Sequence, residues 1–144
     1  MNEQSQSKLA ILQKEGFYIS TPSGTSMEPM LVGGRDQVQI EPLNQKAKKG
    51  DVLLYESAHG EQVLHRVVRV CKDGYLLRGD NRIFTEKVAH DAVIGILTAF
   101  WQDGKKVDCR KSLRYRLYTR TRGAAYLLRR VKTKVRKLKK KKEK

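Results

Sequence analysis

The sequence is poor in cysteine, with only Cys71 and Cys109 among 144 residues. Two thiols so far apart, without a CxxC pair, form neither a disulfide framework nor a zinc-binding pattern. We therefore expect free thiols in a reducing compartment and no metal site. The patterns GxGxxG, GxxxxGK and HExxH are also missing, so no nucleotide or metal cofactor is expected.

Long apolar runs are absent as well. The longest covers residues 92–101 and is interrupted by Gly95 and Thr98, so it is far shorter than the roughly 20 residues of a membrane-spanning helix. The polar N-terminus, MNEQSQSKLAILQKEG, does not have the pattern of a secretory signal. These features predict a cytoplasmic chain without a membrane span, attached at most peripherally to the inner face of the membrane.

Acidic residues are nearly missing from the C-terminal part. Residues 105–144 contain 19 Lys and Arg but only two acids, whereas residues 1–104 contain 12 basic and 13 acidic residues. The formal net charge of +16 therefore comes from the tail. Such an asymmetry predicts that the tail meets an anionic partner.

The first part of the chain has the pattern of a β protein. A short helix is expected over 3–16, ended by Gly16. Short alternating or apolar segments follow, separated by turn residues such as Asp73-Gly74 and Asp103-Gly104. The expected strands are 17–20, 36–41, 52–55, 62–70, 75–78, 93–101 and 106–109. Many short strands with close turns predict a mainly β fold, either a barrel or a coiled sheet.

Residues 110–144 show helical periodicity instead. Gly123 is expected to kink or divide this basic amphipathic helix, and 139–144 to be frayed. The chain is thus divided into an N-terminal helix or arm (1–16), a β domain (17–109) and a helical tail (110–144). The apolar residues of the tail recur at intervals of three, four or seven: Leu113, Leu117, Ala124, Leu128, Val131, Val135 and Leu138.

One segment of the β domain, Ser23-Gly24-Thr25-Ser26-Met27-Glu28-Pro29-Met30-Leu31, has the features that a nucleophilic serine requires. A serine hydroxyl is a weak nucleophile unless a base takes its proton, and the oxyanion formed on attack needs backbone N–H donors. A serine on a tight turn after glycine, with proline fixing the chain beyond, meets both needs. On composition alone, a loop connecting two strands explains the segment equally well.

This segment resembles the nucleophile box, G-x-S-M-x-P-x-L, of type I signal peptidases and the related LexA-type self-cleaving repressors. Four further segments resemble the other boxes of this superfamily, in the same order and with fitting spacing: Lys49–Tyr55 (K-x-G-D-hydrophobic), Leu64–Val68 (general-base box), Arg78–Asn81 (GDN box) and Val93–Gly95 (V-x-G strand). The resemblance implies a signal-peptidase/LexA-like coiled β-sheet or partial barrel, and a serine-type endopeptidase.

The resemblance also implies that Ser26 is the nucleophile and His65 its general base. Typical bacterial members carry Lys at the position of His65, whereas archaeal and endoplasmic-reticulum signal peptidases carry His. Neutral imidazole is a competent base near neutral pH, so a Ser–His pair is chemically coherent. Without the serine box, a histidine that shares a strand face with Val63 and Val67 would be interpreted as a core residue.

A histidine base is usually oriented by a third group, often a carboxylate, and two candidates are open. Asp80 belongs to the GDN box, although Gly-Asp-Asn also makes a good turn without any catalytic duty. Glu86 lies six residues later, where histidine-type relatives place an acid close to their base. The backbone N–H of Ser26 is the main expected oxyanion donor. Some bacterial relatives add a serine hydroxyl where this chain has Gly24, and Ser23 and Thr25 are alternative donors.

Three partners fit the basic tail: an anionic membrane surface, a helix of a protein partner, or nucleic acid. A solvated, partly disordered extension that only aids solubility is the alternative without a partner. An amphipathic helix can lie on an anionic membrane with its apolar side down, and Tyr115, Tyr118 and Tyr126 suit the headgroup layer. Nucleic acid is disfavoured because phosphate contact needs no apolar face, and residues 1–104 have no basic stripe or aromatic platform.

The prediction is therefore a serine endopeptidase that uses a Ser–His pair to cleave a peptide or protein precursor at the inner membrane surface, held there by residues 110–144. The alternative is a non-catalytic module of signal-peptidase-like fold that binds a peptide strand without cutting it.

Overall fold

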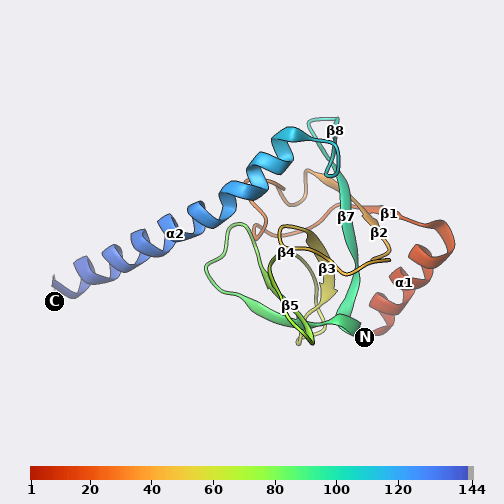
Figure 1. The fold of residues 1–144 in the computed structure, drawn as a ribbon, viewed down its shortest axis with the longest axis horizontal. Coiled ribbons are helices and arrows are strands. Elements are labelled where there is room, and N and C mark those ends of the chain that lie inside the picture. Colours follow the sequence, from red (N-terminus) through yellow and green to blue (C-terminus); the bar gives the residue numbers. More distant parts are fainter. Residues whose placement is uncertain (143–144) are drawn as a thin grey trace.

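The computed structural model describes residues 1–142 and the side chains of residues 1–136. An antiparallel sheet of eight strands forms the body, a short helix packs against it near the N-terminus, and a long helix leaves it at the C-terminus (Figure 1). The strand order is β1-β2-β7-β3-β4-β5-β6, and β8 pairs with β7. The prediction of a mainly β protein with a helix at each end is confirmed.

The elements follow the chain in this order: α1 Glu3–Glu15, β1 Tyr18–Ser20, β2 Gln37–Glu41, β3 Val52–Glu56, β4 Gln62–Val70, β5 Gly74–Arg78, β6 Glu86–Ala89, a 3-10 turn His90–Ala92, β7 Val93–Gln102, β8 Lys105–Asp108 and α2 Leu113–Lys142. The seven expected strands are present within one or two residues of their predicted bounds. Strand β6 was not predicted.

Helix α1 is delimited at both ends by its capping residues. The side chain of Asn2 accepts a hydrogen bond from the backbone N–H of Ser5, and Gly16 ends the helix with a left-handed φ of 78°, as glycine does most readily. Leu12 is 1% exposed. A Cβ at Gly95 of β7 would lie 3.2 Å from Cδ1 of Leu12, so the absence of a side chain there lets α1 approach the sheet closely.

Strand β3 is buried on both faces and separates two apolar clusters. Val52 and Leu54 belong to the cluster that contains Leu12 and the methionines of the serine segment. Leu53 and Tyr55 belong to a second cluster with Val67, Tyr75 and Leu77. Because side chains alternate along a strand, the buried face that carries Tyr55 is also the face on which a side chain of β4 can meet it.

Helix α2 runs without interruption through Gly123, so the expected division of the tail into two helices is wrong. Its first half lies over the body and its second half projects away from it (Figure 1). Of the segment expected to be frayed, residues 139–142 are helical, and 143–144 lie outside the described residues.

The aromatic residues of α2 contact the body of the protein. The hydroxyl of Tyr115 receives a hydrogen bond from Arg66 (3.4 Å), and that of Tyr118 donates to Asp80 (3.0 Å). The ring of Tyr126 lies 3.5 Å from the guanidinium of Arg78. In the described structure these three tyrosines therefore contact the body of the protein, and the headgroup contact suggested for them stays a prediction.

Both cysteines are free, as predicted. Burial raises the pKa of the Cys109 thiol to about 12, which leaves it protonated and poorly nucleophilic at neutral pH.

Candidate active site

Ser26 lies in the loop that joins β1 to β2, and the residues after it anchor that loop in the core. Met27, Met30 and Leu31 are 5%, 5% and 2% exposed, whereas Ser26 is half-buried. The backbone N–H of Leu31 donates to the carbonyl of Met27 (3.1 Å), which closes a tight turn. The apolar positions of the segment thus hold the chain while the serine remains accessible.

Two glycines allow this loop to fold on itself. Gly24 has a left-handed φ of 81°, a conformation that costs glycine little. A Cβ at Gly33 would lie 2.2 Å from the carbonyl oxygen of Gly24, so only a residue without a side chain fits there. The two backbone segments consequently pack directly against each other just before Ser26.

The loop after β5 packs directly on the serine. The backbone N–H of Asn81 donates to the carbonyl of Ser26 (2.8 Å), and its side-chain amide donates to the carbonyl of Thr25 (3.1 Å). A Cβ at Gly79 would lie 2.6 Å from the carbonyl oxygen of Ser26 and 3.0 Å from Nε2 of His65. Gly79 therefore permits the close approach of Ser26 and His65, two residues that are 39 positions apart in the sequence.

His65 projects from the middle of β4, and Tyr55 and Glu86 lie on its far side. Nδ1 of His65 is 2.9 Å from the hydroxyl of Tyr55, and that hydroxyl donates to Oε2 of Glu86 at 2.5 Å. A phenol has one proton. Since Tyr55 gives its proton to Glu86, its oxygen accepts from His65, which assigns the imidazole proton to Nδ1 and leaves a lone pair on Nε2.

The Nε2 atom of His65 is buried and has no hydrogen-bond partner among residues 1–142. Burial lowers the pKa of His65, and the nearby charge of Glu86 opposes this shift. The imidazole is therefore neutral at neutral pH. A neutral imidazole with its free lone pair near the serine backbone is the form that a general base requires, although Ser26 and His65 are not hydrogen-bonded to each other.

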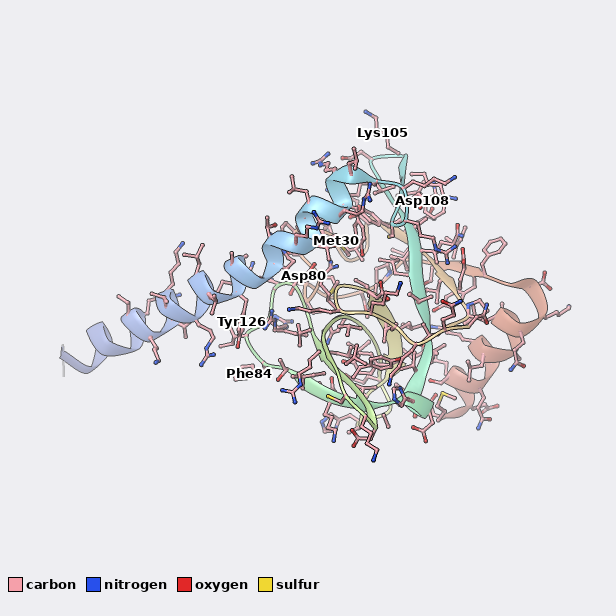
Figure 2. The ribbon with its side chains drawn as sticks, viewed as in Figure 1. Met30, Asp80, Phe84, Lys105, Asp108 and Tyr126 are labelled. Atoms are coloured by element: carbon pink, nitrogen blue, oxygen red, sulfur yellow. The ribbon has the colours of Figure 1, made fainter. Side chains whose placement is uncertain are left out.

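Asp80 has different partners. Its carboxylate accepts two hydrogen bonds from Arg66, at 2.8 and 2.7 Å, and a third from Tyr118 at 3.0 Å. Within the described part of the chain it makes no hydrogen bond to His65. Met30 and Asp80 lie beneath the first half of α2 (Figure 2), and Arg66 contacts both. Of the two carboxylates considered for orienting His65, only Glu86 is connected to it, and the connection passes through Tyr55.

The residues expected to supply an oxyanion donor are Gly24, Thr25 and Ser26. The backbone N–H of Ser26 has no hydrogen-bond partner in the described structure, so it is free to donate to a substrate carbonyl. Gly24 has no side chain to offer, and Thr25 is exposed with its carbonyl engaged by Asn81. The backbone N–H of Ser26 is thus an available donor of this loop, as is that of Met27, which also has no partner in the described structure.

A cavity of about 660 Å³ lies beside Ser26, and we call it the serine cleft. Residues 20–27 line one side and residues 60–64 another, while Lys8 of α1 and Arg82 add positive charge. The size of the serine cleft falls within the range of cavities that bind small molecules or short peptide segments. Within the described part of the chain, no group of three or more His, Cys, Asp or Glu residues could hold a metal ion.

Comparison with known proteins adds no further constraint, because no family model and no curated protein matches the chain.

Sequence reasoning missed two residues of this site. Tyr55 was interpreted only as part of a buried strand, because its role depends on the pairing of β3 with β4, in which Tyr55 opposes Val63 and Leu53 opposes His65. The role of Gly79 was assigned to a turn, yet what it provides is space between Ser26 and His65.

Proposed function

We propose that the chain is a serine-type endopeptidase with a signal-peptidase/LexA-like fold, in which Ser26 is the nucleophile and His65 the general base. The observation that carries this proposal is the state of His65. One ring nitrogen is held by Tyr55, and the other is buried, unpartnered and next to Gly79 and the backbone of Ser26. A buried polar atom without a partner is costly, so its presence at this position is best explained by function. The order of the five sequence boxes supports the same class.

In the proposed reaction, Oγ of Ser26 attacks the carbonyl carbon of a peptide bond while its proton passes to Nε2 of His65. The backbone N–H of Ser26 stabilises the oxyanion. The C–N bond then breaks as Nε2 returns the proton to the leaving amine, and an acyl-enzyme remains. Water, deprotonated by His65, attacks the ester, and the new carboxyl product leaves as Ser26 regains its proton. Apo structures often lack the Ser–His hydrogen bond that forms with substrate.

Tyr55 and Glu86 position the base in this proposal. Nδ1–H of His65 donates to Tyr55, which fixes the tautomer and the ring orientation. The charge of Glu86 stabilises the imidazolium that forms during attack, because it favours the protonated form of His65. Both act on the reaction only through His65, so both are positioning residues.

Replacing Tyr55 by Phe is expected to lower kcat/KM about 10²-fold, because Nδ1–H loses its acceptor. Replacing Glu86 by Gln is expected to cost less rate but to move the acid limb of the kcat/KM profile to lower pH, since the carboxylate raises the pKa of His65. In the wild type this limb should already lie below pH 6.5, because burial lowers that pKa and the active form is the neutral one. Peptide cleavage measured across pH tests both changes.

A merely structural role of Tyr55 and Glu86 would lower the yield of folded protein without shifting the limb. If the acid limb of Glu86→Gln lay at unchanged or higher pH, the proposed effect of Glu86 on His65 would be contradicted. The exposed Glu15 of α1, outside the serine cleft, provides the matched control: Glu15→Gln removes one negative charge without altering the lining of the cleft.

The principal alternative is a peptide-binding module without catalysis. The missing hydrogen bond between Ser26 and His65 is the observation that favours it. It predicts that peptides bind in the serine cleft and are recovered intact by mass spectrometry, and that Ser26→Ala does not alter their affinity.

We further propose that α2 holds the enzyme on an anionic membrane surface. No helix among the described residues is long and apolar enough to span a bilayer. By helical periodicity, the side of α2 opposite its tyrosines carries an apolar stripe flanked by Arg and Lys. The apolar side chains that remain exposed on α2 are Leu113, Leu117, Leu127, Leu128, Val131 and Val135, at 45–73%. Leu138, also expected in this stripe, lies outside the described side chains.

The double variant Leu117→Gln with Leu128→Gln is expected to weaken binding to vesicles that contain phosphatidylserine tenfold or more, because each leucine contributes roughly 1.5–3 kcal/mol when fully buried. Sedimentation with vesicles at physiological salt measures the bound fraction. Ile11→Gln, an equivalent change at an exposed residue of α1 (42%), serves as the control. Equal retention of the wild type and the double variant, or equal binding to pure phosphatidylcholine, would contradict membrane attachment through this stripe.

A further inference from the structure

A second cavity, of about 480 Å³, lies between α2 and the strands β4 and β5, and we call it the helix cavity. It is separate from the serine cleft, with which it shares no lining residue. Tyr126 on α2 and Asp80 on the loop after β5 mark this part of the molecule in Figure 2. Its charged lining residues are Lys49, Arg66, Arg78, Asp80, Arg120 and Arg122.

The charges of the helix cavity do not balance. Its single carboxylate, Asp80, is already bound by Arg66 through two hydrogen bonds. The other four cations form no ion pair within the described part of the chain. Placing several unpaired cations around one cavity is electrostatically unfavourable unless an anion joins them. The arrangement therefore has the electrostatics of an anion-binding site.

Two of the unpaired arginines of the helix cavity are held in place by aromatic rings. The guanidinium of Arg78 lies 3.5 Å from the centre of the Tyr126 ring, and that of Arg122 lies 4.0 Å from the centre of the Tyr118 ring. Stacking fixes the plane of a guanidinium and leaves the N–H groups at its edge available to a ligand. Burial also lowers the pKa of Arg78, a cost that a neighbouring anion would remove.

The Nε atom of Arg122 provides an independent observation. It is buried and has no hydrogen-bond partner in the described structure. A buried N–H without an acceptor costs about 1–3 kcal/mol, and such groups in native proteins call for an explanation, for example an ion. Arg122 lines the helix cavity, so a small shift of its side chain would let an anion there supply the missing acceptor.

We propose that the helix cavity binds a phosphate-bearing anion, gripped by Arg78 of β5 and Arg122 of α2, with the exposed Lys49 and Arg120 at its rim. Guanidinium groups bind phosphate oxygens through paired N–H donors, and four unpaired cations suit a multiply charged phosphate better than a single carboxylate. The site does not depend on the peptidase proposal, since none of these four cations lines the serine cleft.

Binding of an anion in the helix cavity would also affect the loop that contacts Ser26. The anion would join α2 to β5, whose end continues into Gly79, Asp80 and Asn81, and Asn81 donates to the carbonyl of Ser26 (2.8 Å). Arg129 of α2 already donates to the carbonyl of Asp80 (2.8 Å). Binding would therefore fasten α2 over the loop that packs on the serine segment.

The test is calorimetric titration of the full chain with inorganic pyrophosphate, against sodium chloride of equal ionic strength. The wild type is expected to bind one equivalent saturably. The double variant Arg78→Gln with Arg122→Gln should bind tenfold or more weakly, because hydrogen bonds to charged groups are lost. Arg116→Gln, which removes one positive charge at an exposed position of α2 outside the helix cavity, should bind as the wild type does.

A second double variant, Lys49→Gln with Arg120→Gln, alters only exposed residues and should also weaken pyrophosphate binding severalfold. It replaces the first double variant in the test if circular dichroism shows that the first one is unfolded. Vesicles that contain phosphatidic acid distinguish the source of the phosphate: competition with pyrophosphate indicates a lipid headgroup, and no competition indicates a free anion. Absence of saturable pyrophosphate binding, or equal weakening by Arg116→Gln, would overturn the proposal.

Discussion

Replacing Ser26 by Ala is expected to abolish peptide cleavage while leaving the fold intact. The backbone of Ser26 and Nε2 of His65 both lie against Gly79, and loss of a serine nucleophile typically costs at least about 10⁴-fold in kcat. The side chain of Ser26 makes no hydrogen bond within the described residues, so its removal should change the free energy of unfolding by no more than about 0.5 kcal/mol. A rate effect without a stability effect is characteristic of a catalytic group.

The measurement uses a complex peptide mixture and the intact protein itself, with mass spectrometry to detect new peptide termini and self-cleavage. His65→Ala should remove the same cleavages as Ser26→Ala. The control is Ser7→Ala, an exposed serine of α1 outside the serine cleft, which should retain full activity. Cleavage that survives Ser26→Ala would eliminate the proposed nucleophile.

The strands could be predicted because their signals are local. Alternation or apolar runs bounded by Gly, Asp and Asn located β2, β3, β4, β5, β7 and β8. Strand β6 has the sequence Glu-Lys-Val-Ala, in which only Val88 is buried. Its formation depends on pairing with β5, from Gly74–Ala89 to Leu77–Glu86, and four mostly polar residues carry no periodic signal of that pairing.

The continuity of α2 has a similar explanation. Glycine in a helix interior costs about 1 kcal/mol relative to alanine, and this favoured a break at Gly123. Contacts on both sides of that glycine compensate: Tyr118 and Thr119 precede it and bind Asp80 and Arg66, and Arg129 follows it and binds the carbonyl of Asp80. Tertiary contacts of this kind are invisible to a propensity argument. They also explain why the tail tyrosines face the body.

Within the candidate site, Ser26 and His65 could be proposed from sequence because each lies in a recognisable box. The group that orients His65 could not be chosen, since the decision depends on which carboxylate the fold brings to Nδ1. Sheet register places Tyr55 between His65 and Glu86, whereas Arg66, the neighbour of His65 on β4, points to the other side of the strand and binds Asp80. Alternation along a single strand therefore separates the two acids.

Replacing Asp80 by Asn is expected to lower the free energy of unfolding by about 3–5 kcal/mol, the typical cost of removing one partner of a buried ion pair. The side chains of Arg66 and Asp80 are 4% and 3% exposed, so water cannot compensate the remaining guanidinium. Urea denaturation followed by circular dichroism measures the change. Asp91→Asn, at an exposed aspartate, should alter stability by less than about 0.5 kcal/mol.

This variant also separates two roles for the residue that sequence reasoning could not distinguish. If Asp80 oriented His65, its replacement would lower kcat in protein of unchanged stability. If it joins Arg66 to α2, stability falls first, and combining Asp80→Leu with Arg66→Met should restore much of it, because replacing both partners of a buried pair by apolar residues is often neutral or stabilising. If Asp80→Asn instead kept the stability of the wild type and lost peptide cleavage, Asp80 would have to be assigned a role in catalysis.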